Sequence, residues 1–370
     1  MLIHGYSASG TTFAHPLLPG GGLAGALFRD GRDVWVLDLR SSAGMPTARE
    51  PWFFEQMGCQ DIPLAIDHIC RCTGAQRVDV VAHCMGAAML ALGLFAEKLE
   101  PGVDRFPKLR AALHQRLGWL VLSQVGPALV MSPANMARAY VMQWLRQFVN
   151  LGSFEFTPEK PGTADDMADR LLAAVPYPQA DFFRENPMWP PGARTTWVAA
   201  RHRMDALYGV TFKLDGMSDA VLEAIDDFFG PMNLQTVAQV IAFARYGIVT
   251  DRRGDGACMV PSRIAEVWRT RDSTHRTLCL HSTENGLLDI ATRERMIDLL
   301  NDAHCAGQSI EFRDMGHQDS LIGRRAPAVY RAICQFLSKE SSHDDQPRVD
   351  PSAAAAQDAA AEVLRCAANS

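Results

Sequence analysis

The chain has 370 residues, 48% of them hydrophobic and 21% charged, which is enough apolar material for one large domain or two modest ones. Its formal net charge of −6 argues against binding to nucleic acid or to an anionic membrane surface. There is no apolar run of the roughly 18 residues that an integral membrane helix needs and no signal-peptide pattern at the start, so we expect a cytoplasmic protein.

Nine cysteines without an export signal favour buried thiols in a reducing compartment. Their spacing does not suggest a zinc site, and no flavin-binding glycine motif follows a predicted strand. We therefore expect no metal and no organic cofactor.

Strands and helices are predicted to alternate along most of the chain. In chain order we expect strands at residues 1–3, 33–38, 78–82, 117–122, 277–281 and 309–312. Helical patterns cover residues 61–72, 87–95, 292–306 and 326–337. This alternation predicts a mostly parallel sheet with helices on both faces.

The pattern changes in the middle of the chain, where strands are few and helical pieces such as 137–148 and 220–229 are rich in aromatic residues. We therefore expect an α/β core in two parts, residues 1–125 and 271–337, with a mostly helical cap at 126–270 inserted between them. Residues 338–370 are polar and then alanine-rich, and are expected to form a flexible tail.

The segment Ala82-His83-Cys84-Met85-Gly86 lies between a buried strand and an apolar helix. This is the setting of a nucleophile elbow, whose usual pattern is Gly-x-Ser-x-Gly, with Cys84 in the serine position. The positive end of the following helix should lower the pKa of the thiol and favour the reactive thiolate. A random core cysteine is the alternative, and features in the correct chain order argue against it.

Two backbone N–H groups are placed to stabilise an oxyanion. His4-Gly5-Tyr6 follows the first strand, and Met85 follows the nucleophile. The N–H groups of Tyr6 and Met85 should converge beside Cys84, and loss of one such donor typically costs about 10²–10³ in kcat.

His317 lies between the last strand and the last helix, where the general base of this arrangement belongs. The acid that orients it should follow strand 277–281. There Asn285 is the first candidate, Glu284 the second and Asp289 the third, since a Cys–His pair can work with asparagine. The order of nucleophile, orienting residue and histidine is that of α/β-hydrolases.

Residues 4–10, 35–40, 80–86 and Gly316-His317-Gln318-Asp319 carry a family resemblance. They resemble the α/β-hydrolase module fused behind GMC-type (cholesterol-oxidase-like) oxidoreductases. More distantly they resemble acid lipases and polyhydroxyalkanoate synthases, and the synthases also use a cysteine in the elbow. The resemblance covers residues 1–125 and 275–337 and implies an α/β-hydrolase with an esterase- or lipase-like acyl-transfer role on sterol-like or other hydrophobic esters.

The usual first strands of that fold are apparently missing, so the chain is either a fragment of a longer fusion or covered by another chain. An exposed sheet edge predicts a homo-oligomer. The leading hypothesis for function is hydrolysis of a small hydrophobic carboxylic ester through a thioester on Cys84. An acyltransferase of the polyester-synthase type and a non-catalytic hydrolase-like partner domain are the alternatives.

Overall fold

In the computed structural model the chain forms the parallel sheet that its apolar pattern predicts. The structure describes residues 1–97, 99–146, 153–156, 201, 203–205, 209–213, 215–255, 258–270, 276–305 and 307–338. Residues 1–334 form one unit and residues 335–370 a second, of which only 335–338 are described. The predicted tail beyond residue 338 lies outside the described residues.

Six strands form one sheet in the order β2-β1-β3-β4-β7-β8, and every neighbouring pair is parallel. The strands are β1 (Leu2–Ile3), β2 (Val36–Leu37), β3 (Val78–His83), β4 (Leu117–Ser123), β7 (Thr277–Ser282) and β8 (Gly307–Phe312). β4 and β7 are buried along their whole length, as expected for inner strands of a sheet covered on both faces. The edge strand predicted over residues 33–38 is shorter than expected, because β1 offers only two residues for pairing.

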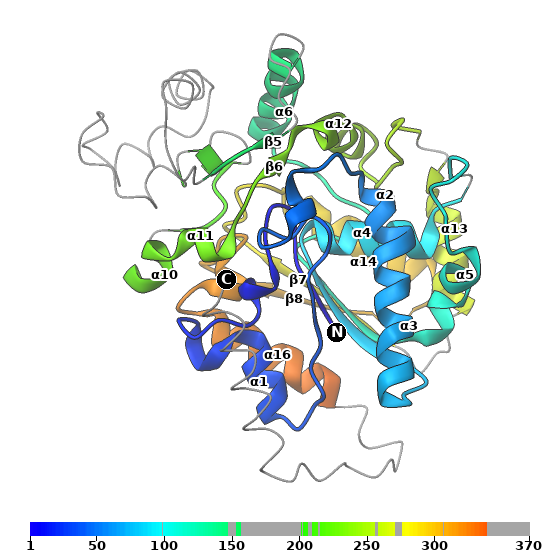
Figure 1. Cartoon of the computed structure of the whole chain (residues 1–370), viewed down its shortest axis with the longest axis horizontal. Helices are drawn as coiled ribbons and strands as arrows, with labels where there is room; N and C mark the ends of the chain where they lie inside the picture. The colour runs from blue at the N-terminus through cyan, green and yellow to red at the C-terminus, as the bar shows by residue number, and fades with distance from the viewer. Residues whose placement is uncertain are drawn as a thin grey trace. The chain divides into compact units, whose positions relative to one another are not determined.

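Helices connect the strands and cover the sheet, with α3 and α4 on one side and α1 on the other (Figure 1). They are α1 (Gly22–Arg29), α2 (Phe54–Gln56), α3 (Ile62–Thr73), α4 (Met85–Phe95), α5 (Pro107–Arg116), α14 (Ala291–Asp302), α15 (Asp319–Ile322) and α16 (Ala326–Ser338). A π-helical turn, Met57–Asp61, joins α2 to α3. α4 is apolar on all sides and almost completely buried, which fixes its first turn, and the residue before it, in the middle of the molecule.

The chain between β4 and β7 is mainly helical where it is described. Its elements are α6 (Pro133–Arg146), β5 (Ser153–Phe154), α10 (Asp219–Glu223), α11 (Ile225–Phe228), β6 (Met232–Asn233), α12 (Val237–Tyr246) and α13 (Pro261–Thr270). β5 and β6 pair antiparallel, and α6 packs against α12. The cap boundaries at residues 126 and 270 stay predictions. None of the helices in the described ranges combines the length and apolar character needed to cross a membrane.

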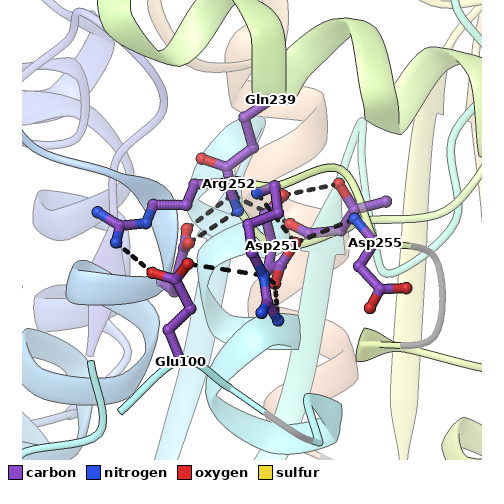
Figure 2. Close-up of polar contacts among 8 residues, drawn as sticks. Glu100, Gln239, Asp251, Arg252 and Asp255 are labelled. Carbon is purple, nitrogen blue, oxygen red and sulfur yellow. Dashed lines mark hydrogen bonds and ion pairs between the residues drawn. The ribbon is translucent and has the colours of Figure 1, made fainter. Parts of the chain in front are cut away.

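A buried polar network anchors the later part of this region on the core (Figure 2). Glu55 of α2 accepts hydrogen bonds from the backbone N–H of Arg252 at 2.8 Å and from Gln239 Nε2 at 2.7 Å. Arg252 also pairs with Glu100, and the buried Asp251 pairs with Arg253 at 2.7 Å. Because each buried carboxylate has partners, the network fixes α12 and the following loop beside α2.

Candidate active site

Cys84 occupies the strained turn between β3 and α4. Its backbone has φ 53° and ψ −134°, a conformation that non-glycine residues rarely adopt. The turn packs so closely that a Cβ on Gly86 would lie 2.4 Å from the carbonyl oxygen of His4 and 2.9 Å from that of Ile3. The sequence Cys84-Met85-Gly86 therefore forms the elbow geometry that its pattern predicts, and Cys84 lines a cavity.

The backbone N–H groups of Tyr6 and Met85 both donate to the Cys84 thiol. The loop that carries Tyr6 is held by the buried His4. Its Nε2 accepts from the N–H of Leu39 at 3.1 Å, so its Nδ1 must donate to the carbonyl oxygen of Gly5 at 2.8 Å. The two N–H groups thus reach the nucleophile from separate segments of chain.

Burial raises the pKa of the Cys84 thiol to about 11, although the hydrogen bonds from Met85 and Tyr6 act in the opposite direction. The sequence-based expectation of a lowered pKa is therefore wrong. A helix N-terminus and two N–H groups compensate only part of the cost of placing a thiolate in an apolar interior. At neutral pH this residue is a thiol.

His317 lies in the loop between β8 and α15 and is fully buried. Its Nδ1 is 3.2 Å from Asn285 Oδ1. That Asn285 atom also accepts from the N–H groups of Leu287 at 3.0 Å and Leu288 at 3.2 Å, which identifies it as the oxygen. His317 Nδ1 must therefore donate, and Nε2 carries the free lone pair of a general base.

His317 Nε2 is buried and has no hydrogen-bond partner among the described residues, and its ring lines the same cavity as Cys84. Burial, with smaller contributions from His83 and His281, lowers the pKa of His317 well below its usual value. The structure thus brings together a neutral thiol and a neutral imidazole whose basic nitrogen is unoccupied.

Gln124 orients Asn285, although no motif in the sequence pointed to it. It follows β4 with φ 72°, is fully buried, and its Oε1 accepts from Asn285 Nδ2 at 3.1 Å. The same oxygen accepts from the N–H of Ser282 at 3.1 Å, and Gln124 Nε2 donates to Ser282 Oγ at 2.8 Å. The sequence feature that could have indicated Gln124 is a polar residue directly after a buried strand, because ligand-binding sites of parallel sheets lie at the carboxyl ends of the strands.

The other acidic candidates lie elsewhere. Glu284 is exposed, with its carboxylate 4.0 Å from Lys213 Nζ. Asp289 accepts from the N–H of Ala291 at 2.9 Å, at the start of α14. Asn285 is thus the candidate that contacts the histidine.

Two further residues hold the histidine loop. Asp319 accepts from the N–H groups of Gly316 at 2.7 Å and Lys213 at 3.1 Å, and burial raises its pKa to about 6. The His83 ring is 5.1 Å from the His317 ring, and its Nδ1 is 3.0 Å from Ser123 Oγ. His83 therefore lies beside the site, with its ring held by Ser123 of β4.

The cavity beside Cys84 is mainly apolar. Its lining includes Met85, Val125, Met131, Ala139, Met204, Phe229, Met232, Val237, Val240, Leu287 and Leu288. Apart from Met85 at the elbow and Leu287 and Leu288 after β7, these residues lie between β4 and β7, so that region supplies most of the apolar wall. Within the described ranges, no group of three or more His, Cys, Asp or Glu side chains is placed to hold a metal ion.

No protein-family model and no curated protein matches the chain. Among solved structures it is similar to a monoacylglycerol lipase of Paleococcus ferrophilus, with 12% identity, coverage of 92% of this chain and 93% of that one, and a TM-score of 0.46. It is also similar to an esterase of Thermogutta terrifontis, with 15% identity, coverage of 92% and 89%, and a TM-score of 0.44. A carboxylesterase structure from Nitrososphaera gargenis shares 7% identity, with coverage of 93% and 90% and a TM-score of 0.48.

Because these TM-scores are below 0.5, we base the function on the geometry of the site alone. The strand order, the parallel pairing and the strained turn before α4 are those of an α/β-hydrolase fold.

Proposed function

We propose that the chain is a carboxylic ester hydrolase in which Cys84 is the nucleophile and His317 the general base. The observation that carries the proposal is the cavity that Cys84 and His317 share, with the N–H groups of Tyr6 and Met85 directed at the sulfur. In this arrangement a carbonyl carbon held at the sulfur has its oxygen within reach of both donors.

Acylation starts from the neutral pair. His317 Nε2 takes the thiol proton as the bond between Cys84 Sγ and the carbonyl carbon forms, and the N–H groups of Tyr6 and Met85 hold the resulting oxyanion. When the oxyanion collapses, the carbon–oxygen ester bond breaks. His317 returns the proton to the departing alkoxide, which leaves as the alcohol, and a thioester remains on Cys84.

Deacylation repeats these steps with water. His317 takes a proton from the attacking water, the carbon–sulfur bond breaks, and the same proton returns to Cys84 Sγ as the acid leaves. Asn285 keeps the Nδ1–H in place during both steps and thereby keeps Nε2 available. It supplies no charge, so the imidazolium formed in each step is stabilised by hydrogen bonding alone.

The apolar lining supports a hydrophobic acyl group as the substrate moiety next to Cys84. The test is hydrolysis of p-nitrophenyl esters from acetate to palmitate by the wild type and by Cys84→Ala. Cys279→Ala is the matched control, because Cys279 is equally buried but lies on β7 outside the cavity lining. Loss of turnover in Cys84→Ala alone supports the proposal, and unchanged turnover in that variant overturns it.

The same assay separates the alternatives. Acid released in water indicates a hydrolase, whereas a new ester formed from an added alcohol at the expense of acid indicates an acyltransferase. If no ester is turned over, a non-catalytic partner domain becomes the better reading.

We also propose that the chain forms homo-oligomers through the β2 edge of the sheet. Val36 and Leu37 are half-exposed and pair with β1 only, within the described part of the chain. Light scattering that gives a single monomer mass at micromolar concentration would remove this proposal.

A further inference from the structure

Helix α3 carries a histidine and a cysteine that the proposed reaction does not use. His68 and Cys72 are four residues apart, so they lie on the same face of the helix, and both are exposed. Cys72 Sγ lies 3.5 Å from His68 Nε2 and 3.9 Å from His68 Nδ1. A thiol and an imidazole, both of which are preferred ligands of zinc, are therefore in contact and open to solvent.

The separation of the two ligand atoms suits a single metal ion. A tetrahedral zinc ion binds sulfur at about 2.3 Å and nitrogen at about 2.0–2.1 Å, which places the two ligand atoms about 3.5 Å apart. Cys72 Sγ and His68 Nε2 already have this separation. The neighbouring cation Arg71 pairs with Asp67 at 2.9 Å, so its charge is balanced within the helix. The ring of Trp35 packs edge-on against the imidazole, with 5.9 Å between the ring centroids, and restricts its orientation.

One chain supplies only part of such a site. A structural zinc ion takes four protein ligands, and among the described residues no third His, Cys, Asp or Glu side chain joins the pair. The pair lies beside an open edge of the sheet, because Trp35, whose ring contacts His68, directly precedes β2. Antiparallel pairing of two β2 edges places a twofold axis perpendicular to the sheet, so both copies of α3 then lie on the same face of the joined sheet.

We propose that His68 and Cys72 form half of a zinc site, which the same two residues of a second copy complete to a tetrahedral set of two cysteines and two histidines. The ion replaces one thiol proton on each chain, so two protons are released for each ion bound and no electrons are transferred. The site is independent of the proposed ester hydrolysis. It differs from the expectation of no metal, which considered the ligands of one chain alone, and it names the ligand that would join two copies at the β2 edge.

The test is the effect of Zn²⁺ on self-association of the purified chain, kept reduced by a phosphine so that no disulfide forms. Sedimentation velocity over a dilution series gives the Kd of the dimer with and without the metal. Zn²⁺ should lower this Kd at least about a hundredfold, with saturation at one ion for two chains, and EDTA should reverse the effect. Mg²⁺ should have no effect, because it prefers oxygen ligands.

Three variants identify the ligands. Cys72→Ser and His68→Ala should each abolish the response to Zn²⁺, and both should keep the metal-free Tm because the two side chains are exposed. Cys70→Ser is the matched control and should keep the response. Cys70 lies on the same helix, but it is half-buried and two residues from Cys72, so it points in a different direction.

Co²⁺ in place of Zn²⁺ reports the coordination directly. It should give a thiolate-to-cobalt charge-transfer absorption and the intense visible bands of tetrahedral coordination, and Cys72→Ser should lose both. The proposal is overturned if Zn²⁺ leaves the Kd of the dimer unchanged, if each monomer binds its own ion, or if Cys72→Ser responds to Zn²⁺ as Cys70→Ser does. None of these measurements needs an ester, so the zinc site stands or fails separately from the proposed hydrolysis.

Discussion

Replacing Asn285 by Asp tests how the histidine is held. The new carboxylate keeps one oxygen facing His317 Nδ1, where Asn285 Oδ1 now lies at 3.2 Å. Its second oxygen takes the place of Nδ2, which is 3.1 Å from Gln124 Oε1. Two acceptors then face each other, and turning the Gln124 amide over would lose the hydrogen bond from the Ser282 backbone N–H and place two donors against each other there.

The expected cost follows from these contacts. One hydrogen bond worth about 1 kcal/mol is lost, and an unpaired buried acceptor adds about 1–3 kcal/mol, so the free energy of unfolding should fall by about 2–4 kcal/mol. For a domain of this size the Tm should fall by on the order of 3–6 °C. At the same time the negative charge favours the imidazolium, so the pKa of His317 should rise.

The assays are thermal unfolding and kcat/KM measured from pH 4 to 8. Since the base must be unprotonated, a higher pKa of His317 moves the acid limb of the profile to higher pH. Glu284→Gln is the control, because the exposed Glu284 faces Lys213 and should affect neither measurement. The reasoning is refuted if Asn285→Asp leaves both the Tm and the acid limb unchanged, or if Glu284→Gln shifts the limb instead.

Three more outcomes are expected from the same geometry. Alkylation of Cys84 by iodoacetamide, followed by peptide mass spectrometry, should accelerate about tenfold per pH unit from pH 7 to 10, because the pKa of the thiol is raised to about 11. An alkylation rate that reaches a plateau above pH 8 would contradict this. Gly86→Ala should lower the free energy of unfolding in urea by about 1–3 kcal/mol, since the added Cβ would lie 2.4 Å from the carbonyl oxygen of His4. Gly44→Ala is the control and should have little effect, because a Cβ at that position would have no atom within 4 Å. The free energy of unfolding should fall as the pH drops below 6.5, because buried histidines with lowered pKa values stay neutral in the fold while those of the unfolded chain bind protons. Each such histidine should lower the free energy of unfolding by about 1.4 kcal/mol per pH unit. The raised pKa values of Asp319 and Glu55 offset only part of this loss, so a Tm that stays constant from pH 7 to 5 would disprove it. The four histidines concerned are His4, His83, His281 and His317.

Local sequence patterns were sufficient for the core strands and for the turn at Cys84. A buried parallel strand is a continuous apolar run, and the elbow needs only a strand, a tight turn with a small residue and an apolar helix, all within about 20 residues. The position of His317 after the last strand follows from the same rhythm of elements. These features are local in the chain, and local patterns report them.

Three properties of the site were decided only by the tertiary structure. Asn285 rather than Glu284 meets the histidine because Gln124, which lies 161 positions earlier in the chain, holds its amide. The pKa of Cys84 is raised because segments distant in sequence close over it and exclude water, and this burial outweighs the helix N-terminus that the local pattern emphasised. The segment at Thr211 lies against the histidine loop because the N–H of Gln318 donates to the carbonyl oxygen of Thr211, about a hundred residues earlier in the chain. Desolvation and long-range hydrogen bonds depend on which segments pack together, and no local pattern of residues contains that information.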